Sequence, residues 1–234
     1  MTDETFRDET DLPGSEDLGD IRLDELTGPL QAACDRAGWK SLVPVQARAI
    51  PYLLAGRDVM IQSRTGSGKT GAYLLPIMQK VDVRKKAAQV LVLVPTRELA
   101  LQVSLEAKLL AGDTEFKTAV VYGGVGYGAQ LEAFRQGAQL VVGTPGRILD
   151  HLLKDTLSLD NLRILVFDEA DRMLSMGFYP DMVKIRKYIP AGKIASSMFS
   201  ATFPPQVVRL ADQFLRHPQL LSLSGNQVHI AEIE

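Results

Sequence analysis

The chain has 234 residues, of which 46% are apolar and 23% are charged, so it is long enough to bury the core of one α/β domain. Its single cysteine, Cys34, excludes an internal disulfide and is expected as a small buried hydrophobe, and no cysteine–histidine cluster has metal-site spacing. No secretory signal or bilayer-spanning apolar stretch of roughly 20 residues is present, so we expect no membrane partner and an intracellular location, cytoplasmic or alternatively nuclear.

The charge is distributed unevenly along the chain. Residues 1–20 contain eight acidic side chains and one basic side chain, Arg7, a formal charge of −7 that leaves +5 of the total of −2 for the remainder. An acidic segment without periodicity is typical of a disordered, solvated tail, which we expect over residues 1–20. The alternative is a regulatory segment that competes with an anionic ligand. A charge of +5 permits nucleic-acid binding without requiring it.

Two helices are expected after this leader. Residues 23–37 have the pattern of an amphipathic helix that is interrupted early by Gly28-Pro29 and capped by Gly38. A second, shorter helix is expected over residues 44–54.

The remaining chain alternates short apolar runs with helical patterns. Each run ends in glycine, proline or polar residues, and the runs are 59–61, 90–94, 119–122, 140–142, 164–167, 195–199 and 220–223. Strands that are apolar on both faces are typical of a parallel sheet covered by helices, so we predict a doubly wound, mostly parallel α/β fold with helices on both faces. Ligands bind beyond the carboxyl ends of such strands, where the polar clusters of this chain should converge.

The first polar cluster fits the phosphate-loop (P-loop) pattern G-x-x-x-x-G-K-[ST], except that a serine replaces the first glycine. Serine is compatible with that position if the turn does not require a positive φ. The lysine would neutralise the β- and γ-phosphates, and the following threonine would ligate Mg²⁺ at a helix N-terminus. The alternative is a flexible Gly/Ser turn. The candidate nucleotide-binding residues are Ser63, Arg64, Thr65, Gly66, Ser67, Gly68, Lys69 and Thr70.

Asp168 and Glu169 follow the apolar run at 164–167. Hydrolysis of a nucleoside triphosphate requires a carboxylate near Mg²⁺ and a second group that orients water. We therefore assign Asp168 to the metal, partly through water, and Glu169 to the attacking water; with Lys69 they are the candidate catalytic residues. The alternative is a solvated acidic turn that caps the next helix. Together with the phosphate loop, these carboxylates favour triphosphate hydrolysis.

Further motifs occur in order, and together they resemble the DEAD-box RNA helicases over residues 21–222. The family signature is present as Asp168-Glu169-Ala170-Asp171, and the loop at 63–70 resembles A-x-T-G-x-G-K-T. The other matching elements are Pro95-Thr96-Arg97-Glu98-Leu99-Ala100, Gly123-Gly124 with Gln130, Thr144-Pro145-Gly146-Arg147 and Ser200-Ala201-Thr202. The resemblance implies a RecA-like N-terminal helicase domain over residues 21–234, with ATP and Mg²⁺ as cofactors.

The resemblance assigns Gln46 to adenine recognition in the Q motif, and a glutamine amide can both donate to and accept from one base edge. The family reads G-F-x-x-P-T-P-I-Q, whereas residues 38–46 read G-W-K-S-L-V-P-V-Q, so Trp39 joins the candidate nucleotide-binding residues. Ile21 stands where the family has an isolated aromatic residue. Because isoleucine offers no π face, we expect weaker affinity for the base.

The resemblance also implies a track for single-stranded RNA. Glycines admit the sugar-phosphate backbone, helix N-termini present N–H groups and arginines attract phosphate, so the contacts would not depend on base sequence. As alternatives, the arginine beside Glu98 would form a surface ion pair, and the T-P-G segment would be a cap and turn. The candidate RNA-binding residues are Pro95, Thr96, Arg97, Gly123, Gly124, Gln130, Thr144, Pro145, Gly146 and Arg147.

Asp171, Ser200 and Thr202 are implied to couple hydrolysis to unwinding through mutual contact, although the two hydroxyls would also suit a helix cap before Pro204-Pro205. The resemblance further implies a partner domain in the parent protein, a second RecA-like domain that bears arginine fingers. Such arginines contribute about 10³–10⁵ in rate. We therefore expect this chain alone to bind nucleotide with little hydrolysis and no unwinding.

For the parent protein, the leading hypothesis is an RNA-stimulated ATPase that unwinds RNA duplexes locally or remodels RNA–protein complexes. The alternative is an ATP-gated RNA clamp or scaffold without unwinding activity. A small-molecule kinase is a third interpretation, but it leaves the RNA-type motifs unexplained.

Overall fold

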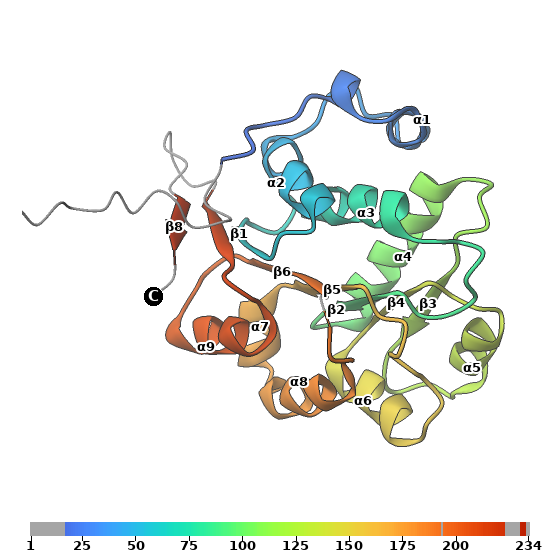
Figure 1. Ribbon diagram of the computed structural model, residues 1–234. Helices are drawn as coiled ribbons and strands as arrows, with labels where there is room; N and C mark the ends of the chain where they lie inside the picture. Colours follow the sequence, from blue (N-terminus) through green and yellow to red (C-terminus); the bar gives the residue numbers. More distant parts are fainter. Residues whose placement is uncertain (1–16, 193, 223–229, 233–234) are drawn as a thin grey trace, which may run out of the picture.

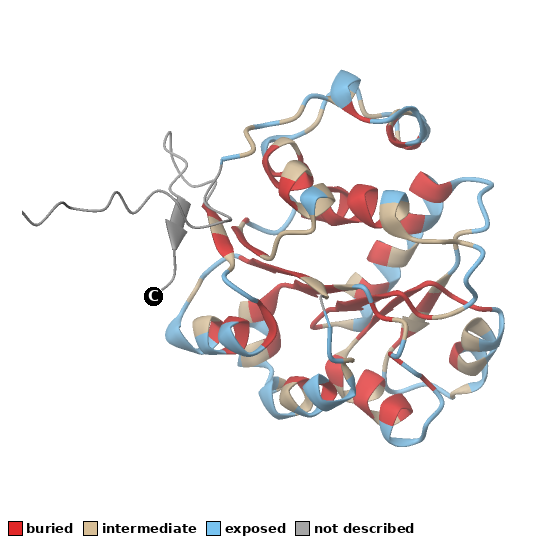
Figure 2. Cartoon of the chain, in the orientation of Figure 1, coloured by how far each residue is buried: buried red, intermediate tan, exposed pale blue. Residues whose placement is uncertain are grey.

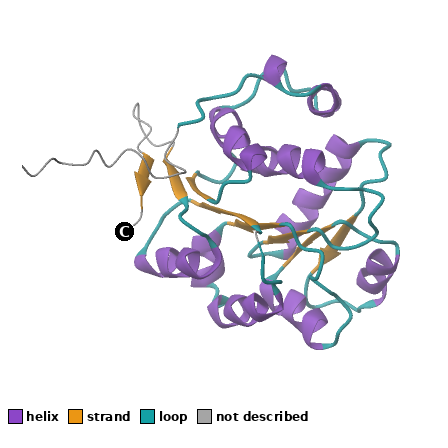
Figure 3. Cartoon of the chain, in the orientation of Figure 1, coloured by secondary structure: helices purple, strands orange, loops and turns teal. Residues whose placement is uncertain are grey.

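Alternating strands and helices build a layered α/β structure in the computed structural model, which describes residues 17–192, 194–222 and 230–232 (Figure 1, Figure 3). The strands are β1 (Val59–Gln62), β2 (Val90–Leu93), β3 (Thr118–Val121), β4 (Leu140–Gly143), β5 (Ile164–Asp168), β6 (Ala195–Ser200), β7 (Gln219–Ser222) and β8 (Ile230–Glu232). The helices are α1 (Gly28–Arg36), α2 (Pro44–Ala55), α3 (Lys69–Lys80), α4 (Arg97–Ala111), α5 (Gly128–Arg135), α6 (Pro145–Leu153), α7 (Ala170–Ser175), α8 (Tyr179–Ile185) and α9 (Pro205–Phe214), with 3-10 turns at Leu23–Glu25 and Arg186–Tyr188.

Within the described residues the strands form one sheet in the order β3-β4-β2-β5-β6-β1-β7-β8. The seven strands β1 to β7 pair in parallel, and β8 pairs antiparallel with β7. The predicted doubly wound, mostly parallel fold is confirmed. The antiparallel strand β8 was not predicted from the sequence.

Two apolar layers cover the two faces of the sheet (Figure 2). Alternate residues of a strand face opposite layers: Val90 and Val92 of β2 pack with α1 to α4, whereas Leu91 and Leu93 pack with α6 to α9. Each such side chain contributes roughly 1.5–3 kcal/mol when it leaves water. Burial on both faces therefore explains why the strands read as unbroken apolar runs.

The N-terminal part differs from the prediction in two places. Gly28-Pro29 begins α1 rather than interrupting a helix, because proline is suited to the first helical turn, where its missing N–H is not needed. The predicted disorder is wrong for residues 17–20: the Asp17 carboxylate lies 2.7 Å from the guanidinium of Arg48 and accepts a hydrogen bond from the Tyr52 hydroxyl. The prediction for residues 1–16 falls outside the described residues.

The described part of the chain contains no helix with both the length and the apolar character needed to cross a bilayer. Cys34 is fully buried in α1, as its apolar neighbours indicated.

Candidate functional site

The order of the strands sorts the predicted motifs into two groups along one edge of the sheet. The phosphate loop, the acidic tetrad and the S-A-T element follow β1, β5 and β6, which are neighbours in the order β5-β6-β1. The three candidate RNA motifs follow β2, β3 and β4, which are neighbours in the order β3-β4-β2. We call the first set of motifs the nucleotide group and the second set the RNA group. Because parallel strands end at the same edge of the sheet, the two sets lie side by side.

The phosphate loop adopts the conformation that its glycines allow. Gly66 and Gly68 have φ values of 79° and 89°, and a side chain at Gly68 would approach Val43 Cγ2 to 2.7 Å. Ser63 is not among the described non-glycine residues with positive φ, so its replacement of glycine causes no strain. The hydroxyls of Ser63 and Ser67 are buried without a hydrogen-bond partner among the described residues. The loop therefore offers unpaired polar atoms to a ligand.

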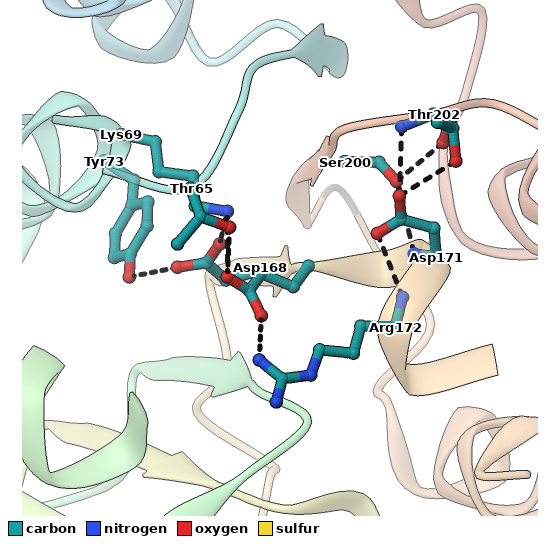
Figure 4. Close-up of polar contacts among 9 residues, drawn as sticks. Thr65, Lys69, Tyr73, Asp168, Asp171, Arg172, Ser200 and Thr202 are labelled. Atoms are coloured by element: carbon teal, nitrogen blue, oxygen red, sulfur yellow. Dashed lines mark hydrogen bonds and ion pairs between the residues drawn. The ribbon is translucent and has the colours of Figure 1, made fainter. Parts of the chain in front are cut away.

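Lys69 connects the loop to the acidic tetrad (Figure 4). Its ammonium lies 3.0 Å from Asp168 Oδ1 and 3.6 Å from Glu169 Oε1. Asp168 has no exposed surface, and its Oδ2 accepts a hydrogen bond of 2.9 Å from the Tyr73 hydroxyl. Burial raises the pKa of Asp168, while the neighbouring Lys69 charge opposes that shift. The Lys69 cation next to Oδ1 thus favours the charged form of this buried acid, against the effect of burial.

Glu169 is held against the phosphate loop by two further side chains. The Thr65 hydroxyl donates to Oε1 at 3.0 Å, and the Arg172 guanidinium donates to Oε2 at 3.2 Å. The backbone of Glu169 is left-handed, with φ 57° and ψ 53°. Such a conformation costs about 1–3 kcal/mol in a non-glycine residue and tends to occur at functional sites. The left-handed backbone at Glu169 lets the chain pass directly from β5 into α7.

The predicted contact between the S-A-T element and the acidic tetrad is present. Thr202 donates to Asp171 Oδ2 from its backbone N–H at 3.0 Å and from its hydroxyl at 2.9 Å (Figure 4). The Asp171 N–H donates to Ser200 Oγ at 3.2 Å, and that hydroxyl donates to the Thr202 carbonyl at 2.7 Å. A cleft of about 510 Å³ opens between this network, Lys69 and Glu169. The three sequence elements therefore share one cavity.

Gln46 connects α2 to the phosphate loop. Its amide accepts from the Val43 N–H at 3.1 Å and donates to the Gly68 carbonyl at 3.1 Å. Trp39 lies against the first turn of α3 so closely that a side chain at Gly71 would approach its ring to 2.2 Å. Gln46, predicted for adenine recognition, and Trp39, predicted for nucleotide binding, thus both lie at the loop, and Ile21 packs at the edge of the adjoining apolar layer.

The site fits a magnesium-bound nucleotide better than a protein-only metal centre. Among the described residues no group of three or more histidines, cysteines or carboxylates could hold a metal. Mg²⁺ commonly uses one or two protein ligands together with phosphate oxygens and water. The Thr70 hydroxyl and Asp168 would supply those ligands, beside a loop whose amides and lysine suit phosphate.

In the second group of motifs, Gly123 and Gly124 are exposed, and α4 and α6 begin after β2 and β4. Thr96 caps α4 by accepting from the Leu99 N–H at 3.2 Å, and the segments at 123–124 and 144–146 follow their strands directly. Arg97 forms an ion pair of 3.0 Å with Glu98, the alternative considered from the sequence. Both side chains are exposed, so the pair is weak and leaves the guanidinium accessible to an anion.

Gln130 and Arg147 take positions that differ from direct RNA contact. Gln130 is buried under the loop at 122–126 and donates to the carbonyls of Tyr122 and Gly126 at 3.3 and 3.4 Å. The Arg147 side chain is 10% exposed, lies 4.4 Å above the Tyr127 ring and donates to the Val125 carbonyl at 2.9 Å. These side chains support the glycine loop from beneath, a correction that follows from the inward faces of α5 and α6.

The sequence motifs did not identify the residues that complete this support. His151 is fully buried, and its Nε2 lies 2.9 Å from Gln130 Oε1 while its Nδ1 lies 2.8 Å from Thr156 Oγ1. The Tyr127 and Phe134 rings pack edge-on against it. His151 is one helical turn after Arg147, so helical periodicity was the only available signal. Tyr73, one turn after Lys69, was missed for the same reason.

Comparisons with known proteins agree with this geometry. A family model described as DEAD/DEAH box helicase matches residues 43–210. The ATP-dependent RNA helicase DeaD of Escherichia coli strain K12 is 47% identical over 205 residues, which are 86% of this chain and 32% of that protein. The DEAD-box ATP-dependent RNA helicase CshA of Geobacillus kaustophilus is 38% identical, covering 89% of this chain and 44% of that protein.

The crystal structure of a DEAD box protein from Methanococcus jannaschii is similar to this fold, with a TM-score of 0.82 and 35% sequence identity. The match covers 87% of this chain and 56% of that one. The chain therefore spans less than half of these two curated relatives and little more than half of the solved structure.

Proposed function

This chain belongs to the DEAD/DEAH box helicase family, as an N-terminal RecA-like domain, and from that premise we propose that it is the ATP-binding and RNA-binding part of an ATP-dependent RNA helicase. The whole enzyme would couple ATP hydrolysis to local unwinding of RNA duplexes or to remodelling of RNA–protein complexes. The observation that carries the proposal is that Lys69 and Glu169 line one cleft, with the buried Asp168 3.0 Å from the Lys69 ammonium.

In this proposal, bound ATP and Mg²⁺ supply the reactive phosphoanhydride and the cation that neutralises it. Lys69 and the loop amides, which Gly66 and Gly68 leave accessible, would hold the phosphate oxygens. Asp168 would hold the cation through Oδ1. Glu169, which Thr65 and Arg172 hold in place, orients the attacking water.

The second group of motifs is proposed to bind the RNA backbone. The exposed Gly123 and Gly124 and the N-termini of α4 and α6 would contact sugar and phosphate without reading bases. The contact between Asp171 and Thr202 would transmit the nucleotide state towards unwinding. A second RecA-like domain of the same protein is proposed to close over both ligands and to supply a transition-state arginine.

Nucleotide binding tests the proposal on this chain, because its only tryptophan, Trp39, lies beside the loop. Mg²⁺-ADP should change the fluorescence of Trp39, and Lys69→Ala should abolish that change. Strand separation is tested on the full-length protein with a labelled RNA duplex. ATP-dependent RNA binding without strand separation would instead establish the clamp or scaffold, and absence of nucleotide binding would refute the proposal.

A further inference from the structure

Tyr73 connects the phosphate-loop helix to two neighbouring strands of the nucleotide site. It lies on α3 one turn after Lys69, and its hydroxyl donates to Asp168 Oδ2 at the end of β5, at 2.9 Å (Figure 4). Its ring packs edge-on against Phe199 of β6, with centroids 5.4 Å apart and an interplanar angle of 63°. Phe199 directly precedes Ser200, so one side chain joins the phosphate-loop helix, the acidic tetrad and the strand that leads into the S-A-T element.

The two oxygens of the Asp168 carboxylate have different partners. Oδ2 is occupied by the Tyr73 hydroxyl, whereas Oδ1 has the Lys69 ammonium at 3.0 Å and no other polar partner among the described residues. A carboxylate held at one oxygen by a rigid buried donor cannot turn freely about its last bond. Oδ1 is therefore the oxygen of Asp168 that is left to interact with a cation.

The environment keeps the phenol a hydrogen-bond donor. Tyr73 is 1% exposed, and its hydroxyl lies 2.9 Å from Asp168 Oδ2. Because a carboxylate oxygen accepts hydrogen bonds, the phenol is the donor of this pair. A phenylalanine would fill the same space and keep the packing against Phe199, so packing alone does not require the hydroxyl.

We propose that Tyr73 is a positioning residue of the magnesium site: its hydroxyl fixes Asp168 so that Oδ1 faces the nucleotide-bound metal. The inference rests on the proposed function, because the metal arrives with the nucleotide. Residues that orient a metal ligand typically contribute 10–100-fold to metal affinity. Tyr73→Phe should therefore raise the Mg²⁺ concentration at half-saturation of ADP binding by about tenfold. Affinity for ADP in EDTA should not change, since Lys69 is untouched.

A matched control exists in the same chain. Tyr52 is also fully buried, and its hydroxyl also bonds an aspartate, Asp17 Oδ1, at 2.9 Å, but this pair anchors residues 17–20 to α2. Tyr52→Phe thus removes an equivalent hydroxyl far from the acidic tetrad. Urea unfolding of both variants measures any general loss of stability.

The experiment titrates Mg²⁺ against a fluorescent ADP analogue bound to the 234-residue chain. The inference predicts the tenfold shift for Tyr73→Phe and less than a twofold shift for Tyr52→Phe. Equal shifts in the two variants, or an equal loss of affinity in EDTA, would overturn it while the proposed function stands. If the unaltered chain binds the analogue without any dependence on Mg²⁺, both the inference and the proposed metal site are refuted.

Discussion

Lys69 Nζ and Asp168 Oδ1 lie 3.0 Å apart, with both side chains buried, so the lysine predicted to bind phosphate is paired with the acid predicted to face the metal. Breaking a buried ion pair by removing one partner leaves an uncompensated charge. A nucleotide that draws Lys69 away from Asp168 would therefore leave a buried carboxylate, whose charge a metal ion at Oδ1 would compensate.

Substituting the lysine tests this pairing. Lys69→Ala should lower the free energy of unfolding at pH 7 by about 3 kcal/mol, because Asp168 loses its countercharge in a buried setting. It should also weaken nucleotide binding at least tenfold, an expected loss of about 1.4 kcal/mol or more. Urea unfolding and ADP titration measure the two effects. Lys108→Ala, which removes an exposed lysine of α4, is the control and should change neither.

Asp168 is assigned to the metal and Glu169 to the attacking water, so we expect a different result for Glu169→Gln. The amide can still accept from Thr65, and the pairing of Lys69 with Asp168 is unaffected, so ADP affinity should stay within about twofold. ATP hydrolysis by the full-length protein should fall by about 10²-fold or more, because no carboxylate orients the water. An equal loss of nucleotide affinity in Glu169→Gln and Lys69→Ala would contradict the assignment.

Glu106 on α4 should make the free energy of unfolding depend on pH near neutrality. Burial, followed by the charge of Asp168, raises the pKa of Glu106 from 4.5 to about 7. The folded chain binds this proton more tightly, so the stabilisation is complete below pH 4.5 and is lost as pH rises through 7. Glu106→Gln should therefore be more stable than the original chain by about 1–2 kcal/mol at pH 8 and similar at pH 5. A constant difference at both pH values in urea unfolding would contradict this assignment.

For His151 we expect the opposite dependence of stability on pH. We also expect its substitution to affect RNA binding and not ADP binding. Burial and the nearby Arg147 charge lower its pKa. The contribution of His151 to the free energy of unfolding is therefore complete above the ordinary pKa of 6.5 and is lost as pH falls below it. His151→Ala also removes the partner of Gln130, which holds the glycine loop. Affinity for a labelled single-stranded RNA should fall about fivefold or more while ADP affinity is unchanged.

The control for that substitution is His217→Asn, because His217 is exposed and asparagine tolerates its left-handed backbone. Fluorescence anisotropy with the same RNA should show no change for this variant. Equal losses of RNA and ADP affinity in His151→Ala would indicate general unfolding rather than support of the loop.

The sequence predicted the fold and the motifs because both depend on local patterns. The apolar runs identified seven strands, and six of them are followed by a motif, so the motifs were expected at one edge of the sheet. Patterns along the chain carry no information about strand order, which decides that β6 lies between β1 and β5. That order is what brings Ser200 next to Asp171 and the phosphate loop.

The residues that were misplaced or missed depend on contacts between distant segments. Gln130 and Arg147 belong to matched motifs, yet their helices turn both side chains under the loop, which only the packing of α5 and α6 decides. Asp17 lies in an acidic leader but pairs with a buried Arg48. Tyr73 is indistinguishable from a core aromatic residue until β5 places Asp168 beside its hydroxyl.

A crystal structure of the chain with Mg²⁺ and a non-hydrolysable ATP analogue would show where the nucleotide binds. We expect the triphosphate on the loop at 63–70, with Lys69 turned from Asp168 to the phosphates and the metal between Thr70 and Asp168 Oδ1. Electron density for the analogue at another place, with Lys69 and Asp168 still paired, would contradict this expectation.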